Sequence, residues 1–293
     1  MVLPRPRLAV AASAAYPDLR PDWPLLRDAL AALDVEASTQ VWTDPAVRWN
    51  EFALVVANGA WDNIHHPDAF LAWADRVADL TQLVNPPHVL RWNMDKRYLA
   101  TLASVGVPTV PTTWLEPSDT VAIDFPPGEF VVKPAISGGA YETARYSPGE
   151  REIARAHAIR LLDAGRTVMV QPYQAAVDTQ GEVGLIFLGG QFSHAIAKGP
   201  LLRPAAGIRG NLWESESIDA VTPTEPQQVT AHAALGAAER LVGPTTYARV
   251  DLVSGAEGSP VVLELELLDP ALFFETQPAA ATRFAQVLRG LML

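Results

Sequence analysis

The chain has 293 residues, of which 49% are hydrophobic and 19% are charged, and its formal net charge is -11. This length and apolar fraction predict a large folded core divided into two or three lobes. The acidic balance argues against a nucleic-acid partner and against an anionic membrane surface, since both require a basic face. Because the chain contains no cysteine, disulfides, thiolate catalysis and cysteine-bound zinc are excluded.

A short apolar run near the N-terminus is interrupted by Pro17 and Asp18, well before the length that a membrane span requires. We therefore expect a cytoplasmic protein with no membrane partner.

The first 88 residues alternate short apolar runs with amphipathic segments. Strands are predicted over residues 7–13, 36–42 and 52–58, and helices from about residue 22 and over residues 68–78. This alternation predicts an open parallel sheet, whose ligands gather beyond the carboxyl ends of its strands. The third strand ends in the loop NGAWDN, which is therefore placed beside a ligand.

A second lobe is predicted after the double proline at residues 86 and 87. A helix over residues 93–105, with Asn93 as its N-cap, precedes the strands 110–114, 129–133 and 167–171 and the helix 148–162. The remainder is rich in strands, which we place at residues 183–188, 191–197, 247–253 and 261–267. The predicted domains are therefore an N-terminal α/β domain (1–88), a central α+β domain (89–170) and a C-terminal domain (171–293).

Three carboxylates mark the last two predicted strands. Alternation places Glu264 and Glu266 on one face, and Asp251 on the neighbouring strand can face them. Three such oxygen ligands suit a Mg²⁺ ion that also holds substrate phosphates. The alternative is an acidic, exposed face of an edge hairpin. The leucines that alternate with these carboxylates indicate a core face on the other side, and we expect the strands to lie inside their sheet, which favours a metal site.

Cations and a glycine-rich loop accompany this acidic face. Lys133 ends a strand just before the loop Ser137, Gly138, Gly139 and Ala140, so a positive charge and free backbone N–H groups are offered together, as phosphates require. Arg249 shares the strand face of Asp251, where an oxyanion could develop. The alternatives are an ordinary turn for the loop, and a structural salt bridge to Glu264 or Glu266 for Arg249.

Other polar residues allow two interpretations each. The run VMVQPYQ, followed by Asp178 and Glu182, reads as a hinge with two carboxylates within reach of a ribose, or as an ordinary strand and loop. Lys198 and Arg209 flank a segment that could close on phosphates, or they are simply solvated. Lys96 is most often a solvated helix lysine.

Taken in order, the segments NMDKRYL, FVVKPAISGGA, VMVQPYQ, GEVGLIFLGGQFSHAIAKGP, YARVDLV and LELELLDP resemble the ATP-grasp superfamily over roughly residues 85–275. The resemblance is strongest to the glutathione-synthetase-like branch that includes the ATP-dependent cyclo-ligase of D-cycloserine biosynthesis, which closes O-ureido-D-serine. It implies an ATP-grasp fold with ATP and Mg²⁺ between a central lid subdomain and a C-terminal subdomain, while the N-terminal domain helps to bind substrate.

The resemblance also implies roles for individual residues. By position, Lys96 and Lys133 would contact the ATP phosphates, Ser137 to Ala140 would form the lid loop, Gln171 and Tyr173 would border the adenine, Asp178 or Glu182 would bind the ribose, Asp251, Glu264 and Glu266 would hold magnesium, Arg249 would stabilise the tetrahedral intermediate, and Lys198 and Arg209 would approach the γ-phosphate.

Two positions depart from the branch. Relatives tend to have Arg-Ser-x-Trp-Asp in the N-terminal loop, where this chain has Asn58 in place of the cation but keeps Trp61 and Asp62. These three residues are candidate substrate contacts. Gly184 stands where relatives often carry Arg or Ser. Both departures fall where the resemblance would place the substrate, so they leave its identity open.

The function implied is ATP-dependent carboxylate–amine ligation through an acyl phosphate, with release of ADP and phosphate, in antibiotic biosynthesis. The substrate would be a small, amino-acid-like molecule, and ring closure within one molecule is one form of the reaction. The alternatives are an intermolecular amino-acid or peptide ligase, a small-molecule kinase, and a non-catalytic nucleotide-binding protein. A non-catalytic protein would be expected to lose part of the carboxylate set, which this chain retains. The oligomeric state is left open, with a homodimer as one arrangement.

Overall fold

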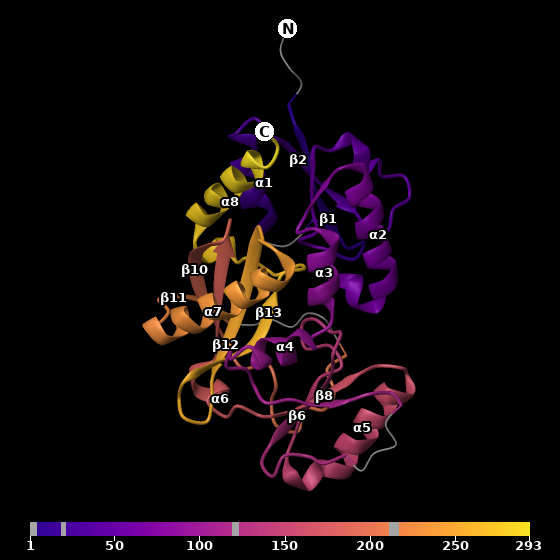
Figure 1. Ribbon diagram of the computed structural model, residues 1–293, viewed down its shortest axis with the longest axis vertical. Helices are drawn as coiled ribbons and strands as arrows, with labels where there is room; N and C mark the ends of the chain where they lie inside the picture. The colour runs from indigo at the N-terminus through magenta and orange to yellow at the C-terminus, as the bar shows by residue number, and fades with distance from the viewer. Residues whose placement is uncertain (1–4, 19–21, 119–122, 211–216) are drawn as a thin grey trace.

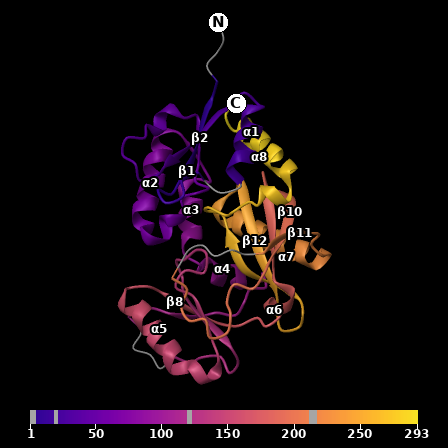
Figure 2. The same cartoon turned by 180° about the vertical axis from the view of Figure 1, so that it is seen from behind.

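The computed structural model describes residues 5–18, 22–118, 123–210 and 217–293, and within them the strands form three sheets. Figure 1 shows the N-terminal sheet at the top, the C-terminal sheet beside and below it, and a small sheet at the bottom; Figure 2 shows the same arrangement from behind. The first sheet is parallel and the other two are antiparallel. This mixed architecture confirms the predicted α/β fold class.

The N-terminal sheet has the strand order β2-β1-β3-β4, with every neighbouring pair parallel. Its elements are β1 (Arg7–Ala12), α1 (Asp22–Ala31), β2 (Glu36–Val41), β3 (Leu54–Val56), the 3₁₀ turns η1 (Trp49–Glu51) and η2 (Trp61–His65), α2 (Pro67–Leu80) and β4 (Gln82–Val84). Leu8 of β1 packs in one cluster with Leu26 of α1, and Ala9 packs in another with Trp73 of α2. Both faces of the sheet are thus covered, which explains why β1 is apolar and buried after Arg7.

The helix predicted over residues 93–105 is wrong, because two helices occupy this region: α3 (Pro87–Met94) and α4 (Tyr98–Ser104). Asn93 is no N-cap. Its side-chain amide donates to the carbonyl oxygen of Leu265 at 2.8 Å and accepts from the backbone N–H of Leu267 at 2.7 Å. Asn93 therefore completes the edge of a distant strand, and the chain breaks just after it, at the segment that carries Lys96.

The central sheet has the order β5-β8-β6-β7 and is antiparallel. Its elements are β5 (Thr113–Leu115), β6 (Phe130–Pro134), β7 (Ala144–Tyr146), the 3₁₀ turn η3 (Pro148–Glu150), α5 (Arg151–Asp163) and β8 (Val168–Pro172). Ala154, Ala158 and Leu161 of α5 pack against Phe130 and Val170 of the sheet. Strand β7 was not predicted from the sequence.

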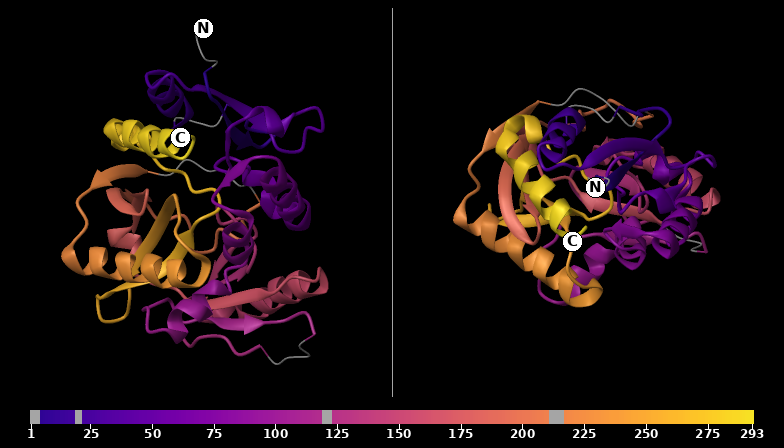
Figure 3. Two further views of the ribbon diagram at one scale, coloured as in Figure 1. Left: turned by 45° about the horizontal axis from the view of Figure 1, so that its top comes forward. Right: turned by 90° about the horizontal axis from the view of Figure 1, so that it is seen from above.

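The C-terminal sheet has the order β11-β10-β9-β12-β13. Its elements are α6 (Val177–Gln180), β9 (Glu182–Leu188), β10 (Gln191–Lys198), β11 (Ile218–Val221), α7 (Glu225–Val242), β12 (Tyr247–Ser254), β13 (Pro260–Glu266), the 3₁₀ turn η4 (Phe274–Thr276) and α8 (Pro278–Gly290). Leu185 and Phe187 pack on the side of α7, whereas Ile186 and Leu188 pack on the side of α8. Figure 3 shows these two helices on opposite sides of the sheet.

The sequence-based interpretation of the C-terminal domain as rich in strands missed its two long helices, α7 and α8. The buried side of α7 is formed largely by alanines, at positions 231, 234, 237 and 238, so its hydrophobic contrast is low. The position of β13 also differs from the prediction, because this strand lies at the edge of its sheet. A bulge in its pairing with β12 turns Leu263 out of the core and into a cavity, while Leu265 and Leu267 stay buried.

The domain limits at residues 88 and 170 remain a prediction, and strand β8 of the central sheet continues past the second of them to Pro172. In the part of the chain that the structure describes, no helix has both the length and the apolar character needed to cross a membrane.

Protonation of His157 should make the fold sensitive to acid. This residue of α5 is only 3% exposed, and its Nδ1 faces the hydroxyl of Tyr146 at 3.0 Å. Among the residues that the structure describes, its Nε2 has no hydrogen-bond partner. Burial, aided by Arg160, lowers the pKa of His157 to about 4. As the pH falls, His157 in the unfolded chain is therefore protonated at about pH 6.5, whereas in the folded chain it is protonated only near pH 4. The contribution of His157 to the free energy of unfolding is therefore fully present above about pH 6.5. We expect the free energy of unfolding to fall by about 2 kcal/mol between pH 7 and pH 5.

Urea unfolding at both pH values measures this loss. A His157→Gln variant should lose less stability than the wild type over the same interval, because glutamine does not titrate. Equal losses in the two proteins would assign the acid sensitivity to other groups.

Candidate active site

A cavity of about 450 Å³ lies where the three sheets meet, bounded by the central sheet, the inner face of the C-terminal sheet and the turn η2 of the N-terminal lobe. Most of the residues singled out from the sequence line it. These are Trp61, Lys96, Lys133, Ser137, Gly138, Gly139, Ala140, Gln171, Tyr173, Glu182, Lys198, Arg249, Glu264 and Glu266. The fold therefore brings together residues that are up to 205 positions apart in sequence, from Trp61 to Glu266.

The N-terminal loop contributes less directly than predicted, because Asn58 and Asp62 do not line this cavity. The side chain of Asn58 donates to the carbonyl oxygen of Pro270. The carboxylate of Asp62 points the other way and accepts a 2.6 Å hydrogen bond from the indole of Trp42. Trp61 alone of the three reaches the cavity, and its indole N–H donates to the main-chain oxygen of Asp269 at 3.2 Å.

Asp178 also lies outside the cavity lining. Both of its oxygens accept from the guanidinium of Arg145, at 2.9 and 3.0 Å, and one accepts from the hydroxyl of Tyr173. Arg145 in turn stacks over the ring of Tyr173 at 3.5 Å and pairs with Glu129. Asp178 is thus a structural partner of Arg145. Of the two carboxylates considered for the ribose, the structure places only Glu182 in the cavity.

Arg209 is the fourth residue that does not line the cavity. Its backbone N–H donates to Thr143, and its carbonyl oxygen accepts from Glu142. Its side chain is buried and donates to the carbonyl oxygen of Leu201. Arg209 therefore holds the segment that follows the glycine-rich loop.

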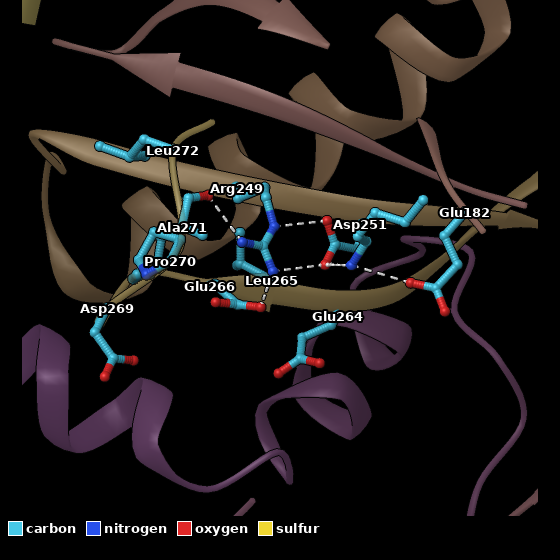
Figure 4. A network of polar contacts seen from close by, with 12 residues as sticks. Glu182, Arg249, Asp251, Glu264, Leu265, Glu266, Asp269, Pro270, Ala271 and Leu272 are labelled. Atoms are coloured by element: carbon cyan, nitrogen blue, oxygen red, sulfur yellow. Dashed lines mark hydrogen bonds and ion pairs between the residues drawn. The ribbon is translucent and has the colours of Figure 1, made fainter. Parts of the chain in front are cut away.

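Arg249 is the centre of a buried ion network, which Figure 4 shows. The guanidinium donates to both oxygens of Asp251, at 2.9 and 3.0 Å, and also to Glu266 and to the carbonyl oxygen of Ala271. Lys198 donates to Asp251 at 2.8 Å and pairs with Glu182 at 3.1 Å. Both alternatives for Arg249 are therefore realised in part, since it lines the cavity and also forms a salt bridge to Glu266.

Asp251 lies behind Arg249 and not in the cavity lining, with only 1% of its surface exposed. Burial alone would raise its pKa, but Arg249 and Lys198 outweigh burial and hold the pKa below its usual range. Asp251 is thus ionised, and its oxygens are taken up by two cations. In this arrangement its observed role is to orient Arg249 and Lys198.

The structure explains why position 184 is a glycine, which the sequence did not reveal. It pairs with Asp251 across strands β9 and β12, and a Cβ atom at Gly184 would lie 2.8 Å from an oxygen of Asp251 and 3.3 Å from Cδ of Arg249. A larger residue would push the ion pair out of place. This departure from the branch therefore falls beside the ion network.

Lysines and backbone N–H groups provide the positive wall of the cavity. Burial, with Lys96 nearby, lowers the pKa of Lys133 to about 8 although Glu264 opposes the shift. The Nζ of Lys96 pairs with Glu264 at 3.0 Å and donates to the carbonyl oxygen of Ser137 at the start of the glycine-rich loop. Gly139 has a φ of 55°, a conformation that glycine adopts without strain. The loop continues into Tyr141, whose ring meets His65 of η2 edge-on at 4.9 Å.

Two carboxylates, Glu264 and Glu266, provide the acidic wall. Burial and the neighbouring carboxylates raise the pKa of Glu266 in spite of Arg249, so this corner would be stabilised by a further cation. Among the described residues, no group of three or more His, Asp or Glu side chains is arranged to hold a metal ion. Mg²⁺ fits the pair nevertheless, because it commonly takes one or two protein carboxylates and completes its shell with phosphates and water. The assignment of Asp251 as a third ligand remains a prediction.

The cavity lining also contains residues that were not singled out from the sequence, among them Asn63, Asp269, Asp22 and Phe273. Asn63 follows the predicted Trp-Asp pair, and its amide donates to the carboxylate of Asp269 at 2.7 Å. Asp22 accepts backbone N–H bonds from Leu272, Phe273 and Phe274 and so fixes the loop after β13. Phe273, also in the lining, has left-handed φ and ψ of 52° and 44°. The one available signal was that Asp269 and Phe273 follow the carboxyl end of β13.

This three-sheet arrangement, in which a glycine-rich loop and lysines face a strand pair that carries carboxylates, is the fold of solved ATP-grasp ligases. A solved structure of the ATP-grasp ligase PsnB, with a phosphomimetic variant of its minimal precursor, Mg and ADP, has this fold. Its TM-score is 0.60 at 18% identity, and the match covers 98% of each chain.

The chain belongs to the family of the D-cycloserine synthetase DcsG. The family model described as "D-cycloserine synthetase DcsG, N-terminal domain" matches residues 8–85. The cycloserine biosynthesis protein DcsG of Streptomyces lavendulae is 39% identical over 96% of this chain and 97% of its own length. The crystal structure of D-cycloserine synthetase DcsG gives a TM-score of 0.89 at 36% identity, covering 98% of this chain and all of that one. The protein is an ATP-grasp ligase, as the sequence predicted.

Proposed function

We propose that this ligase uses ATP and Mg²⁺ to close O-ureido-D-serine to D-cycloserine through an acyl phosphate. The observation that carries the proposal is the single cavity in which Lys96, Lys133 and Arg249 face the carboxylates of Glu264 and Glu266. The 39% identity to DcsG over nearly the whole chain supports the choice of substrate.

The residues of the chain have separable tasks in this reaction. Lys96, Lys133 and the backbone of residues 137–140 bind and orient the phosphates, while Glu264 and Glu266 would hold the magnesium ion. When bound, the magnesium nucleotide would supply the γ-phosphoryl group that converts the substrate carboxylate into an acyl phosphate, from which phosphate is a good leaving group. Arg249 faces the same region and donates to the oxyanion that develops when the ring nitrogen attacks the carbonyl carbon.

The proposed ring closure has two chemical steps, followed by a hydrolysis. A substrate carboxylate oxygen attacks the γ-phosphorus, and ADP leaves. The nitrogen bonded to the side-chain oxygen then forms a C–N bond with the activated carbonyl carbon and gives up its proton, while phosphate departs with the electrons of the C–O bond and can take up that proton. Water releases the carbamoyl group from that nitrogen as carbamic acid. The glycine-rich loop, packed on η2 through Tyr141 and His65, keeps other water from the acyl phosphate.

Incubation with ATP, Mg²⁺ and O-ureido-D-serine as the only organic substrate tests the proposal. We expect ADP, phosphate and D-cycloserine to form in equal amounts, measured by a coupled assay and mass spectrometry. A requirement for a second amine substrate would indicate an intermolecular ligase. A stable phosphorylated product without free phosphate would indicate a kinase, and either result would reject the proposal.

A further inference from the structure

We propose that Asp269 binds the α-ammonium group of the substrate and selects for amino acids at this site. This inference rests on the proposed function, because it names the residue that recognises one group of an amino-acid-like substrate. It concerns specificity, and it assigns Asp269 no part in phosphoryl transfer.

Asp269 lies in the active-site cavity, three residues beyond Glu266. Trp61 and Phe273 line the same cavity. Figure 4 shows the Asp269 carboxylate apart from the Arg249 network. The α-ammonium of an amino acid is bonded to the carbon next to the carboxyl group. A substrate that presents its carboxylate to Arg249 and the phosphates must therefore place the ammonium at a neighbouring wall of the cavity.

The carboxylates that line this cavity differ in their partners. Asp22 accepts backbone N–H groups from the loop after β13. Glu264 pairs with Lys96, Glu266 pairs with Arg249, and Glu182 pairs with Lys198. Within residues 5–18, 22–118, 123–210 and 217–293, no lysine or arginine forms an ion pair with Asp269. Its carboxylate accepts a hydrogen bond from the amide of Asn63.

This environment favours a cationic ligand. Burial and the nearby Glu266 raise the pKa of Asp269 well above its usual value, so its negative charge is poorly compensated by the protein. A buried carboxylate is stabilised when a cation pairs with it. In O-ureido-D-serine the α-ammonium is the only cationic group.

The N-terminal loop holds Asp269 in place. Asn63 binds its carboxylate, Trp61 binds its main-chain oxygen, and Asn58 binds the carbonyl oxygen of Pro270. The loop NGAWDN, which the sequence marked as substrate-binding, thus acts largely through the segment that carries Asp269. Asn63 is a positioning residue in this account.

An Asp269→Asn variant tests the assignment with two substrates, O-ureido-D-serine and its desamino analogue 3-(ureidooxy)propanoate. In the wild type, kcat/KM for the analogue should be about 100-fold lower than for the amino acid, because the analogue lacks the cation that would pair with Asp269. In Asp269→Asn, kcat/KM for the amino acid should fall about 100-fold while that for the analogue changes by less than about threefold. The affinity for ATP, measured by calorimetry, should not change.

Two further variants complete the experiment. Asp75→Asn removes a carboxylate from α2 at the surface, outside the cavity lining, and should leave both substrates unaffected. Asn63→Ala keeps the Asp269 charge but frees its orientation, so we expect a rise of about tenfold in the KM of the amino acid alone. Thermal melts show whether each variant is folded.

Each outcome decides the proposal. Equal losses with both substrates, or no loss with the amino acid, would overturn it. Glu275 is another carboxylate of the cavity lining, and a selective loss in Glu275→Gln but not in Asp269→Asn would also overturn the proposal. If O-ureido-D-serine is not turned over, the proposed function fails. The comparison is then repeated with whichever amino acid in a panel triggers phosphate release, paired with its desamino counterpart. If no amino acid does so, the selection for an ammonium group is itself refuted.

Discussion

Replacement of Arg249 by lysine is expected to lower kcat about 100- to 1,000-fold, a loss typical for one donor to a developing oxyanion. The guanidinium donates at once to Asp251, Glu266 and Ala271 and still faces the cavity. A lysine keeps the charge but lacks the planar fork that reaches several acceptors in fixed directions. Steady-state kinetics with ATP and the amino-acid substrate measure the effect, and the KM for ATP should change little.

The control for this variant is Arg91→Lys, at an exposed ion pair with Asp75 on the surface. It should retain wild-type kinetics. The stability of Arg249→Lys must be measured as well, since breaking a buried ion pair by removing one partner costs about 3–5 kcal/mol. A folded Arg249→Lys protein with a kcat near that of the wild type would show that the network is structural only.

Glu264→Gln is expected to lower kcat about 100-fold and to raise the Mg²⁺ concentration required for half-maximal rate. Glu264 lines the cavity and is partly exposed to it, and its ion pair with Lys96 leaves lone pairs for a cation. Glutamine keeps the volume and one acceptor oxygen but loses the charge. Rates measured over a magnesium titration separate a loss of metal affinity from a loss of turnover.

Glu152→Gln, at an exposed position on α5, is the matched control and should leave the titration unchanged. An unshifted magnesium midpoint in Glu264→Gln would contradict the metal assignment and leave a structural ion pair with Lys96. Asp251→Asn then distinguishes the two roles open to Asp251. A fall in kcat without a shift of the midpoint would identify it as the residue that orients Arg249, whereas a shift would make it a metal ligand.

Much of the fold could be predicted because its strands are short apolar runs with clear boundaries. Strands β1, β2, β9 and β10 begin and end within about two residues of their expected limits. The errors arose where tertiary contacts override local pattern. Asn93 was expected to cap a helix, and it pairs with the edge of β13 instead. Helix α7 was not recognised because the alanines on its buried side differ too little in hydrophobicity from the residues on its exposed side. These alanines are buried because they pack closely on the sheet.

The sequence by itself determined the class of the enzyme, since the order of its motifs and the alternation of carboxylates on β13 are local properties that the chain carries before it folds. Only the tertiary structure decided which polar residues face the cavity. Asp178, Asp62 and Asp251 are as acidic in sequence as Glu264, yet Arg145, Trp42 and Arg249 take up their oxygens. Asp269 lies in the segment LELELLDP but was not singled out from the sequence. It became a candidate only when the fold placed it in the cavity, where no lysine or arginine of the described residues pairs with it. The reason is that the partner of a charged group is set by contacts between residues far apart in the chain, and these are not encoded in any local pattern.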